Sequence, residues 1–448
     1  MERGRGFPLA AARGKSPMKR LLLLMGTETY RAPDFLAAAE KLGVDLVVGT
    51  DAPSGATQLS PAQNVVLPFH DPDRALASVL ERHSAHPFDA VVSADDAATV
   101  LAARTSQAIG LKGNPAESIA AAGNKAVFRD ILRAAGLPGP WHREVEVQAG
   151  PARVSREVTY PCVLKPLFLS ASRGVIRADS AAQFAAAFAR IARLLALPDV
   201  AQRGGALAGK ILVEGFIPGP EFSVEGLLVE GRMKLLALFD KPDPLDGPVF
   251  EETIYVTPSR QPEPVQRAIV GAAADAARAL GLRTGPVHAE VRLGQTSPPH
   301  PPLRGRRGGS EKTGVGLLPV VVELAPRSIG GHCSRSLVFG AGMSLEELIL
   351  RQALGLAPGP TEREGRASGV MMLPIPRAGI LRAVAGQEAA LAVPGIEALD
   401  LAIHPGETLV PLPDGHRYLG FLFAKGATPD AVEGALRRAH ACLRFEIG

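Results

Sequence analysis

The chain has 448 residues, of which 46% are hydrophobic and 21% charged, a balance typical of a folded globular protein with about two to four domains. A formal net charge of +4 and an aromatic content of 5% argue against a dedicated nucleic-acid-binding protein. Cys162, Cys333 and Cys442 are too few and too widely spaced for a disulfide framework or a zinc site. We therefore predict a protein of the reducing cytoplasm.

The first residues of the chain give no sign of membrane insertion. Residues 1–17 are rich in Arg, Gly and Ala and lack an apolar run of signal-peptide length. The aliphatic run from Leu21 to Met25 is far too short to span a bilayer. We expect residues 1–17 to be a disordered extension, with Met18 a candidate for the true start, and we expect no membrane partner.

Strands and helices alternate in the first part of the chain. The pattern predicts strands at Lys19–Met25, Val44–Gly49 and Ala90–Ser93, a helix at Pro33–Leu42, and an acidic turn at Asp95–Asp96. Such alternation predicts a parallel sheet with helices on its faces. Only one glycine, at position 26, follows the first strand, so the three-glycine dinucleotide fingerprint is absent and a nucleotide-free αβ lobe is favoured.

Two lysines and a loop of small residues follow. Asn124 and Lys125 lead into an amphipathic helix, whose apolar positions we take as Val127, Phe128, Ile131 and Leu132. The apolar strand from Tyr160 to Pro166 carries Lys165 near its end. The loop from Ser170 to Val175 contains small residues that let backbone N–H groups approach phosphate oxygens, and Arg173 adds charge. An ordinary hairpin turn is the alternative for this loop.

Two strands and a turn come next, followed by a long insertion. Lys210–Leu228 predicts a strand, a turn at Pro218–Pro220 and a second strand, with polar positions at Glu214, Glu221, Ser223 and Glu225. Residues 294–318 are rich in Pro, Gly and Arg and predict a flexible insertion at a hairpin tip. We expect its basic run to be a solvated loop, a functional lid being the alternative.

Two segments on either side of this insertion carry the strongest signal. Alternation along the upstream strand places His288, Glu290 and Arg292 on one face and the apolar residues Val287, Ala289, Val291 and Leu293 on the other. The downstream strand places Val320, Val322 and Leu324 on an apolar face and Glu323 opposite. If the strands pair, Glu290 and Glu323 meet beside Arg327, as a site for a hard cation and phosphate oxygens requires. Two unrelated surface acids are the alternative.

The pattern changes from about Gly365. Short strands at Val370–Pro374, Leu399–His404 and Tyr418–Ala424 precede a helix at Pro429–Leu443, which predicts a separate α+β cap.

The order of these features resembles the ATP-grasp superfamily. A lysine before a helix, a lysine ending a strand, a small-residue loop, an acidic hinge, His288-x-Glu290 and Glu323-x-x-x-Arg327 follow one another as in its carboxylate–amine ligases, in the amino-acid or dipeptide ligase branch. Leu373–Pro376 and Tyr418–Phe421 resemble the cap of that branch.

The resemblance implies a multidomain fold of the α/β and α+β classes. Its parts are an N-terminal Rossmann-like pre-ATP-grasp lobe (18–112), a two-lobed ATP-grasp core (113–362, with lobes of about 113–212 and 213–362 and the flexible insertion), and a small α+β C-terminal cap (363–448).

The resemblance also implies that ATP lies between the two core lobes. Its phosphates would contact Lys125 and Lys165, and the small-residue loop would close over them through Ser170, Ser172, Arg173 and Gly174. A separate group would bind the nucleoside: Glu214 and the backbone of Phe216 and Ile217 at the adenine, and Glu221 at the ribose.

Metal and catalytic residues follow from the same resemblance. Glu290 and Glu323 would hold magnesium, or manganese in its place. Arg327, with Lys165, would stabilise the transferring phosphate or the substrate carboxylate. His288 is either a residue that orients the substrate or a structural histidine. Where relatives often have Asn, a further metal ligand, this chain has Ala325, which puts the second metal in doubt.

The implied reaction is ATP-dependent ligation of a small carboxylate to an amine, both expected to be amino acids. An acyl phosphate would form first, and the amine would attack it to give an amide, ADP and phosphate. Two alternatives stay open: a non-catalytic nucleotide-binding protein, and a biotin-carboxylase-like enzyme, although Lys425 lacks the flanking methionines of a biotinyl-lysine segment. A homodimer is the expected oligomer.

Overall fold

The computed structural model describes residues 18–27, 29–53, 63–294 and 318–448. Residues 1–17 and almost all of the 294–318 insertion lie outside the described residues, so the predictions made for them stay predictions. Among the described helices, none combines the length and apolarity that crossing a bilayer would need.

The N-terminal domain is the expected parallel sheet. Its strand order is β3-β2-β1-β4, and all three strand pairings are parallel. Its strands and helices are β1 (Arg20–Met25), α1 (Ala32–Leu42), β2 (Asp45–Thr50), β3 (Asn64–Val66), α3 (Pro72–Ala85), β4 (Ala90–Ser93) and α4 (Asp96–Ala108). The acidic turn predicted at Asp95–Asp96 is the start of α4, which the sequence reading did not identify.

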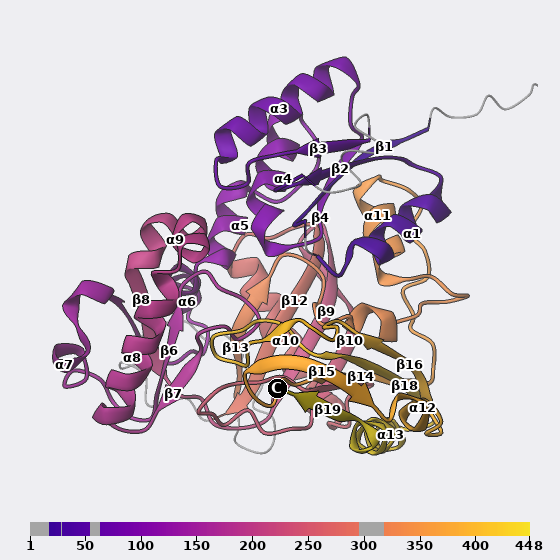
Figure 1. Cartoon of the computed structure of the whole chain (residues 1–448). Coiled ribbons are helices and arrows are strands. Elements are labelled where there is room, and N and C mark those ends of the chain that lie inside the picture. Colours follow the sequence, from indigo (N-terminus) through magenta and orange to yellow (C-terminus); the bar gives the residue numbers. More distant parts are fainter. Residues whose placement is uncertain (1–17, 28, 54–62, 295–317) are drawn as a thin grey trace, which may run out of the picture.

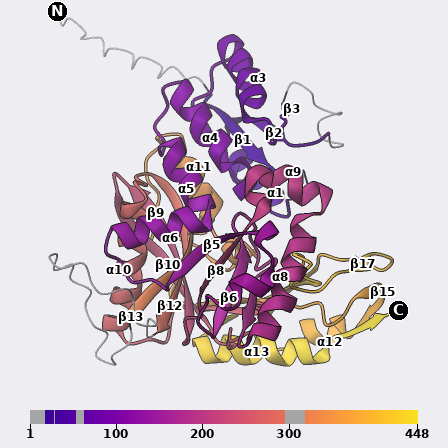
Figure 2. The ribbon, with the colours of Figure 1, turned by 90° about the vertical axis from the view of Figure 1, so that its left-hand side faces the viewer.

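The smaller lobe of the core is built on an antiparallel sheet of order β5-β8-β6-β7 (Figure 2). Its elements are α5 (Ala116–Gly123), α6 (Lys125–Ala134), β5 (His142–Glu146), η1 (Val147–Ala149), α7 (Pro151–Val154), β6 (Cys162–Pro166), β7 (Ile176–Ala178), α8 (Ala181–Leu195), α9 (Pro198–Gly204), η2 (Gly205–Gly209) and β8 (Lys210–Gly215).

Helix α6 begins where the sequence predicts. The side chain of Asn124 caps it by accepting hydrogen bonds from the backbone N–H groups of Ala126 and Val127. Phe128 and Leu132 are buried as expected, but Val127 is 40% exposed. The prediction that Val127 belongs to the apolar face is therefore wrong, because it lies on the outer side of the first helical turn.

The larger lobe rests on an antiparallel sheet of order β13-β12-β9-β10-β11-β14-β18-β16 (Figure 1). Its elements up to the cap are β9 (Glu221–Val229), β10 (Arg232–Lys241), β11 (Ile254–Thr257), α10 (Glu263–Ala279), β12 (Gly285–Gly294), β13 (Leu318–Ala325), η3 (Cys333–Ser336) and α11 (Leu345–Ala353). Helix α10 packs on one face of this sheet, and the turn at Pro218–Pro220 joins β8 of the smaller sheet to β9 of the larger one.

The cap shares this sheet. Its elements are β14 (Ala367–Leu373), β15 (Gly379–Ala385), α12 (Gln387–Leu391), β16 (Ile396–Leu401), β17 (Thr408–Leu409), β18 (Gly420–Gly426), α13 (Pro429–Cys442) and β19 (Arg444–Ile447). Strands β14, β18 and β16 extend the large sheet, and only β17, β15 and β19 form a sheet of their own. The expectation of a separate cap needs this correction, because β14 pairs directly with β11.

A β-bulge corrects the register predicted for β13. Glu323 pairs with Glu290 and Val321 with Val291, so Val322 is one extra residue on this strand. The core therefore takes Val321 and Leu324. Val320 and Val322 do not share their face, and the prediction for these two residues is wrong.

One hydrophobic cluster ties the N-terminal domain to the large sheet. It contains Leu21 and Phe35 of the N-terminal domain together with Phe239, Leu348 and Phe423. The contact between α1 and α11 is part of this junction (Figure 1). Side chains of the N-terminal domain are thereby held next to the end of β13.

Candidate active site

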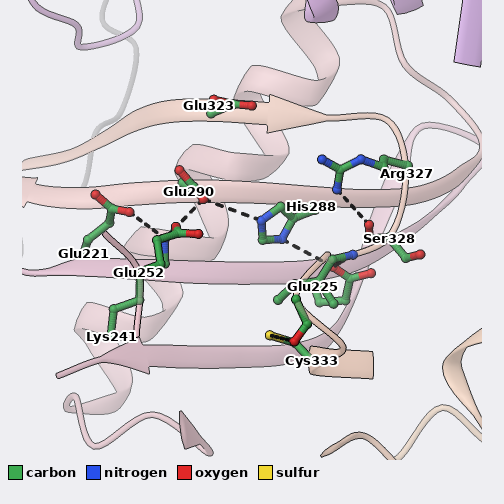
Figure 3. Close-up of polar contacts among 12 residues, drawn as sticks. Glu221, Glu225, Lys241, Glu252, His288, Glu290, Glu323, Arg327, Ser328 and Cys333 are labelled. Carbon is green, nitrogen blue, oxygen red and sulfur yellow. Dashed lines mark hydrogen bonds and ion pairs between the residues drawn. The ribbon is translucent and has the colours of Figure 1, made fainter. Parts of the chain in front are cut away.

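Neighbouring strands of the large sheet present polar side chains on one face (Figure 3). In the pairing of β12 with β9, His288 lies opposite Glu225, Glu290 opposite Ser223, and Arg292 opposite Glu221. The other face is apolar and packs on α10, with Val287, Ala289 and Val291 fully buried. The predicted alternation along β12 is confirmed. The pairing of Glu290 with Glu323 across β12 and β13 is confirmed as well.

Three carboxylates on this face surround one buried lysine. Glu221, Glu252 and Glu290 each offer an oxygen within 4.8 Å of the others. The Lys241 Nζ lies 2.6 Å from Glu221 Oε1 and 3.1 Å from Glu290 Oε1, and it also contacts Glu252. The side chain of Lys241 is 3% exposed. Lys241 was missed by the sequence reading, although a lysine ending a largely apolar strand was a usable signal.

The charges of this acidic cluster shift one another. Burial disfavours the charged form of Lys241, but the three carboxylates outweigh it and raise its pKa well above the ordinary value. Burial raises the pKa of Glu252 to about 7, with Lys241 opposing and the charge of Glu290 adding to it. Against its own burial, Glu290 keeps a pKa well below the usual range because of Lys241 and His288. The cluster therefore holds a surplus of negative charge.

His288 lies between two carboxylates. Its Nδ1 is 3.6 Å from Glu225 Oε2, and its Nε2 is 3.9 Å from Glu290 Oε1. Burial lowers the pKa of His288, but the proximity of these two carboxylates outweighs burial and raises it. Glu225 is fully buried and accepts a hydrogen bond from the Ile329 backbone N–H at 3.0 Å. Its Oε1, like the Ser223 hydroxyl, has no hydrogen-bond partner among the described residues.

The smaller lobe carries the opposite arrangement, two cations around one carboxylate. The Lys165 Nζ lies 2.5 Å from Glu214 Oε1, and the Arg129 Nε donates to Glu214 Oε2 at 2.8 Å. Burial of Glu214 would raise its pKa, but Arg129 and Lys165 lower it to about 2. Burial also lowers the pKa of Lys165, with Glu214 opposing. Both oxygens of Glu214 are thus engaged by cations, so its assignment to adenine stays a prediction.

Arg129 also reaches the larger lobe. Its Nη1 donates to the Val321 carbonyl at 3.1 Å and its Nη2 to the Val322 carbonyl at 2.8 Å. On a regular strand, successive carbonyls point to opposite sides, and the bulge at Val322 lets both face the same guanidinium. Arg129 was not among the predicted site residues.

Lys125 bridges the two lobes. Its Nζ lies 3.1 Å from Glu323 Oε2 and donates to the Leu169 carbonyl at 2.9 Å. Glu323 therefore faces Lys125 and is not part of the group formed by Glu221, Glu252 and Glu290. The two predicted metal ligands are partners in register, but each has a different cation.

The small-residue loop has a strained and crowded backbone. Ala171 and Ser172 have φ of 55° and 53°, in the left-handed region. At Gly174 φ is 76°, and an added Cβ would come within 2.8 Å of Pro166 and 2.9 Å of Leu194. Only glycine fits there without displacing the neighbours. Ser170 and Ser172 belong to the same loop, while Arg173 and Gly174 also contact the cap, as described below.

The segment between the two sheets is held by arginines. The Ile217 carbonyl accepts a hydrogen bond from Arg292 Nη1 at 2.7 Å, and the Phe216 ring lies 4.2 Å from the Arg177 guanidinium carbon. Glu221 accepts from Arg292 Nε at 2.7 Å and also contacts Lys241. Phe216, Ile217 and Glu221, three of the four residues predicted for adenine and ribose, thus lie along one connected segment.

Arg327 is paired with the N-terminal domain. Its Nε and Nη2 donate to the two carboxylate oxygens of Asp96 at 2.7 and 2.8 Å. Burial of Asp96 would raise its pKa, but Arg327 lowers it to about 2. Arg31, from the same domain, contacts the next residue, Ser328. The sequence reading treated Asp96 only as a turn residue, since its partner is 231 positions away.

A cavity of about 510 Å³ is lined in part by the segment that follows β13. Its aromatic part is formed by Tyr30, His332 and Phe421, with the His332 ring centroid 4.6 Å from Tyr30 and 4.7 Å from Phe421. Arg335 lines the cavity and bonds to Asp34 and Asp400. The N-terminal domain, the core and the cap all contribute to its wall.

Three family models match the chain in the expected order. The ATP-grasp N-terminal domain matches residues 36–113, the ATP-grasp domain residues 158–311, and the L-amino acid ligase C-terminal domain 2 residues 371–448. The crystal structure of L-amino acid ligase from Bacillus licheniformis is similar over 96% of this chain and 99% of its own, with a TM-score of 0.78 and 25% identity.

Two curated proteins add to this picture. Alanine–anticapsin ligase from Bacillus amyloliquefaciens is 25% identical over 293 residues, which are 62% of this chain and 57% of that protein. Carnosine synthase 1 from Gallus gallus is 30% identical over 300 residues, which are 64% of this chain and 30% of that protein. The chain thus spans less than two thirds of the length of these relatives.

The mixed α/β architecture and the domain matches define an ATP-grasp protein, as the sequence predicts. Within that superfamily, the chain resembles the amino-acid ligases in its C-terminal domain and in its structure.

Proposed function

We propose that this protein is an ATP-dependent carboxylate–amine ligase that joins amino-acid substrates through an acyl phosphate. The observation that carries the proposal is the pair of oppositely charged clusters, one rich in cations on the smaller lobe and one rich in carboxylates on the larger lobe. The names of two similar proteins, alanine–anticapsin ligase and L-amino acid ligase, support the same class of substrate.

The cation-rich cluster suits the phosphates of ATP. Lys165 and Arg129 share a single carboxylate, so one positive charge is left for an anion. Lys125 adds a further cation at the lobe junction. These charges would stabilise the phosphoryl group during its transfer. The adenine would sit against Phe216 and Ile217, and the ribose near Glu221.

The residues present fit a magnesium or manganese ion. Glu290 and Glu323 are partners across β12 and β13, and both are carboxylates, the ligands these cations prefer. Bound there, the metal would neutralise charge on the phosphates of the nucleotide. When Glu323 binds the metal, Lys125 would leave Glu323 and move toward the phosphates. Ala325, the register partner of His288, has no side-chain oxygen to bind a metal. We therefore propose that the protein holds one metal ion and that water would supply the missing ligand of a second.

Arg327 and His288 act on the substrate side in this proposal. Arg327 would stabilise the substrate carboxylate or the transferring phosphate, in the position that Asp96 sets. His288, held between Glu225 and Glu290, would orient the substrate. The amine would then attack the acyl phosphate, forming the C–N bond and releasing phosphate. The domain boundaries, the cytoplasmic location and the homodimer remain parts of this proposal.

The proposal is tested by ADP and phosphate release from MgATP across single amino acids and amino-acid pairs, with mass spectrometry of the products. ADP that appears only with a particular pair, together with the matching dipeptide, is the expected result. Nucleotide binding with no ADP release under any acceptor would favour the non-catalytic alternative. Release that depends on bicarbonate and biotin but on no amino acid would favour the biotin-carboxylase-like one.

A further inference from the structure

A turn of the cap is hydrogen-bonded to the loop that we assign to the ATP phosphates. The Gly174 N–H donates to the Pro413 carbonyl at 2.8 Å. Next to it, the Arg173 Nε donates to the Asp414 carbonyl at 2.9 Å. Two consecutive residues of the loop are thereby joined to two consecutive residues of the cap, about 240 positions later in the chain. The cap thus fixes the backbone of the loop and one nitrogen of its arginine.

The same turn is anchored to the smaller lobe by an ion pair. The two oxygens of Asp414 accept from Arg190 on α8, from Nε at 3.0 Å and from Nη2 at 2.8 Å. Two parallel hydrogen bonds between a guanidinium and a carboxylate fix orientation as well as distance. The Asp414 side chain therefore sets where its own carbonyl, and that of Pro413, meet the loop.

Gly415 makes the tight shape of this turn possible. The Gly415 N–H donates to the Pro411 carbonyl at 3.0 Å. An added Cβ on Gly415 would lie 1.8 Å from the Val410 carbonyl oxygen, which belongs to the backbone and cannot swing away. The turn is therefore built for a glycine at this position, and a side chain there would displace the two carbonyls that hold the loop.

The contacts leave part of Arg173 available. Its Nε is engaged by Asp414, whereas its Nη1 and Nη2 make no hydrogen bond to the residues that the structure describes. A guanidinium held by one nitrogen keeps the other two for an anion, without the entropy cost of ordering a free side chain. The strained φ values of Ala171 and Ser172 fit a loop that its surroundings hold in one conformation.

We propose that the cap turn 411–415 positions the phosphate loop, with Asp414 as the positioning residue that acts through Arg190, Arg173 and Gly174. This role rests on the proposed function, since it takes the loop to be a binder of nucleotide phosphates. The cap would then contribute to ATP affinity even though no residue of this turn has to touch the nucleotide.

The experiment compares Asp414→Asn and Gly415→Ala with the wild type. Amide hydrogen exchange of residues 170–175 and the Kd for MgADP are measured for each, and the KM values for MgATP and for the acceptor where turnover is found. Asp414→Asn should speed the exchange and weaken nucleotide binding about two- to fivefold, the range for an exposed ion pair. Gly415→Ala should weaken it about ten- to hundredfold, because the backbone must move.

Two further variants separate positioning from general stability. Arg190→Gln should weaken nucleotide binding as much as Asp414→Asn, and the double variant no more than either, because both changes break one contact. Asp414→Glu should restore part of the affinity. Glu397→Gln, which removes the partner of Lys425 elsewhere in the cap, is the matched control and should leave loop exchange and Kd unchanged.

The possible failures differ from one another. Unchanged amide hydrogen exchange of residues 170–175 in both Asp414→Asn and Gly415→Ala would show that the cap turn does not hold the loop. Faster exchange with unchanged nucleotide affinity would overturn the positioning role. A wild type that binds nucleotide but joins no substrates would sink the proposed ligase activity and leave this inference standing.

Discussion

The two lobes of the core use opposite mixtures of charge. On the smaller lobe, Lys165 and Arg129 share the carboxylate of Glu214, so two cations face one anion. On the larger lobe, Lys241 and Arg292 face three carboxylates, those of Glu221, Glu252 and Glu290. Each cluster is incomplete by itself, since a buried surplus charge calls for a counter-charge. A phosphate ester on one side and a divalent cation on the other would supply it, and MgATP contains both.

The largest effect should come from removing the lysine inside the acidic cluster. Lys241→Met leaves three carboxylates in a buried site with Arg292 beside Glu221 and His288 beside Glu290 but no cation at their centre, so we expect the free energy of unfolding to fall by about 3–5 kcal/mol. Urea unfolding at pH 7 measures it. Lys234→Met on the same strand, where the side chain is 51% exposed, is the control and should cost less than about 1 kcal/mol. Equal losses of unfolding free energy in the two variants would show that Lys241 does not stabilise the acidic cluster.

The cation-rich cluster should be weakened next, and in a pH-dependent way. The folded-state pKa of Glu214 is lowered from 4.5 to about 2, so its contribution is present above about pH 4.5 and is lost as the pH falls toward 2. At pH 7 Glu214→Gln should therefore cost about 3 kcal/mol. Urea unfolding of both proteins between pH 7 and pH 3 should show the difference shrinking as the pH falls. A difference that stays constant would mean that the charge of Glu214 is not responsible.

The metal assignment is tested by Glu323→Gln, which removes one charge with little change of volume. We expect ADP release to fall by about hundredfold, in line with the loss of a group that stabilises transition-state charge. Circular dichroism and the unfolding midpoint should stay close to the wild type. Rising Mn²⁺ concentration should restore little of the activity. Near-normal turnover would rule out Glu323 as a metal ligand.

The smallest effect should come from Lys125, which bridges the two lobes. Lys125→Gln removes the contact with Glu323 and one cation from the proposed phosphate site. We expect nucleotide affinity to fall about tenfold, while the free energy of unfolding changes by less than about 1 kcal/mol. Calorimetric titration with MgADP measures the affinity. The same loss in nucleotide affinity from Lys112→Gln, at an exposed position just before this lobe, would show that the effect is not specific to Lys125.

Local pattern accounts for the parts that were predicted well. The strand period of two placed Glu290 and His288 on one face of β12, and the burial of Val287, Ala289 and Val291 agrees. The cap of α6 by Asn124 is also a local matter. The prediction of which β13 residues face the core was wrong because of a bulge. A bulge depends on the pairing with the partner strand, and the sequence of one strand does not reveal that pairing.

The sequence by itself determined which residues could serve as strands, caps and carriers of charge, since these depend on neighbours one to four positions away. Only the tertiary structure decided which charges meet. Arg129 finds Glu214 across 85 positions, Arg327 finds Asp96 across 231, and Arg190 finds Asp414 across 224. Burial then decides how much each ion pair contributes to stability, because a charge removed from water is costly unless an opposite charge lies beside it.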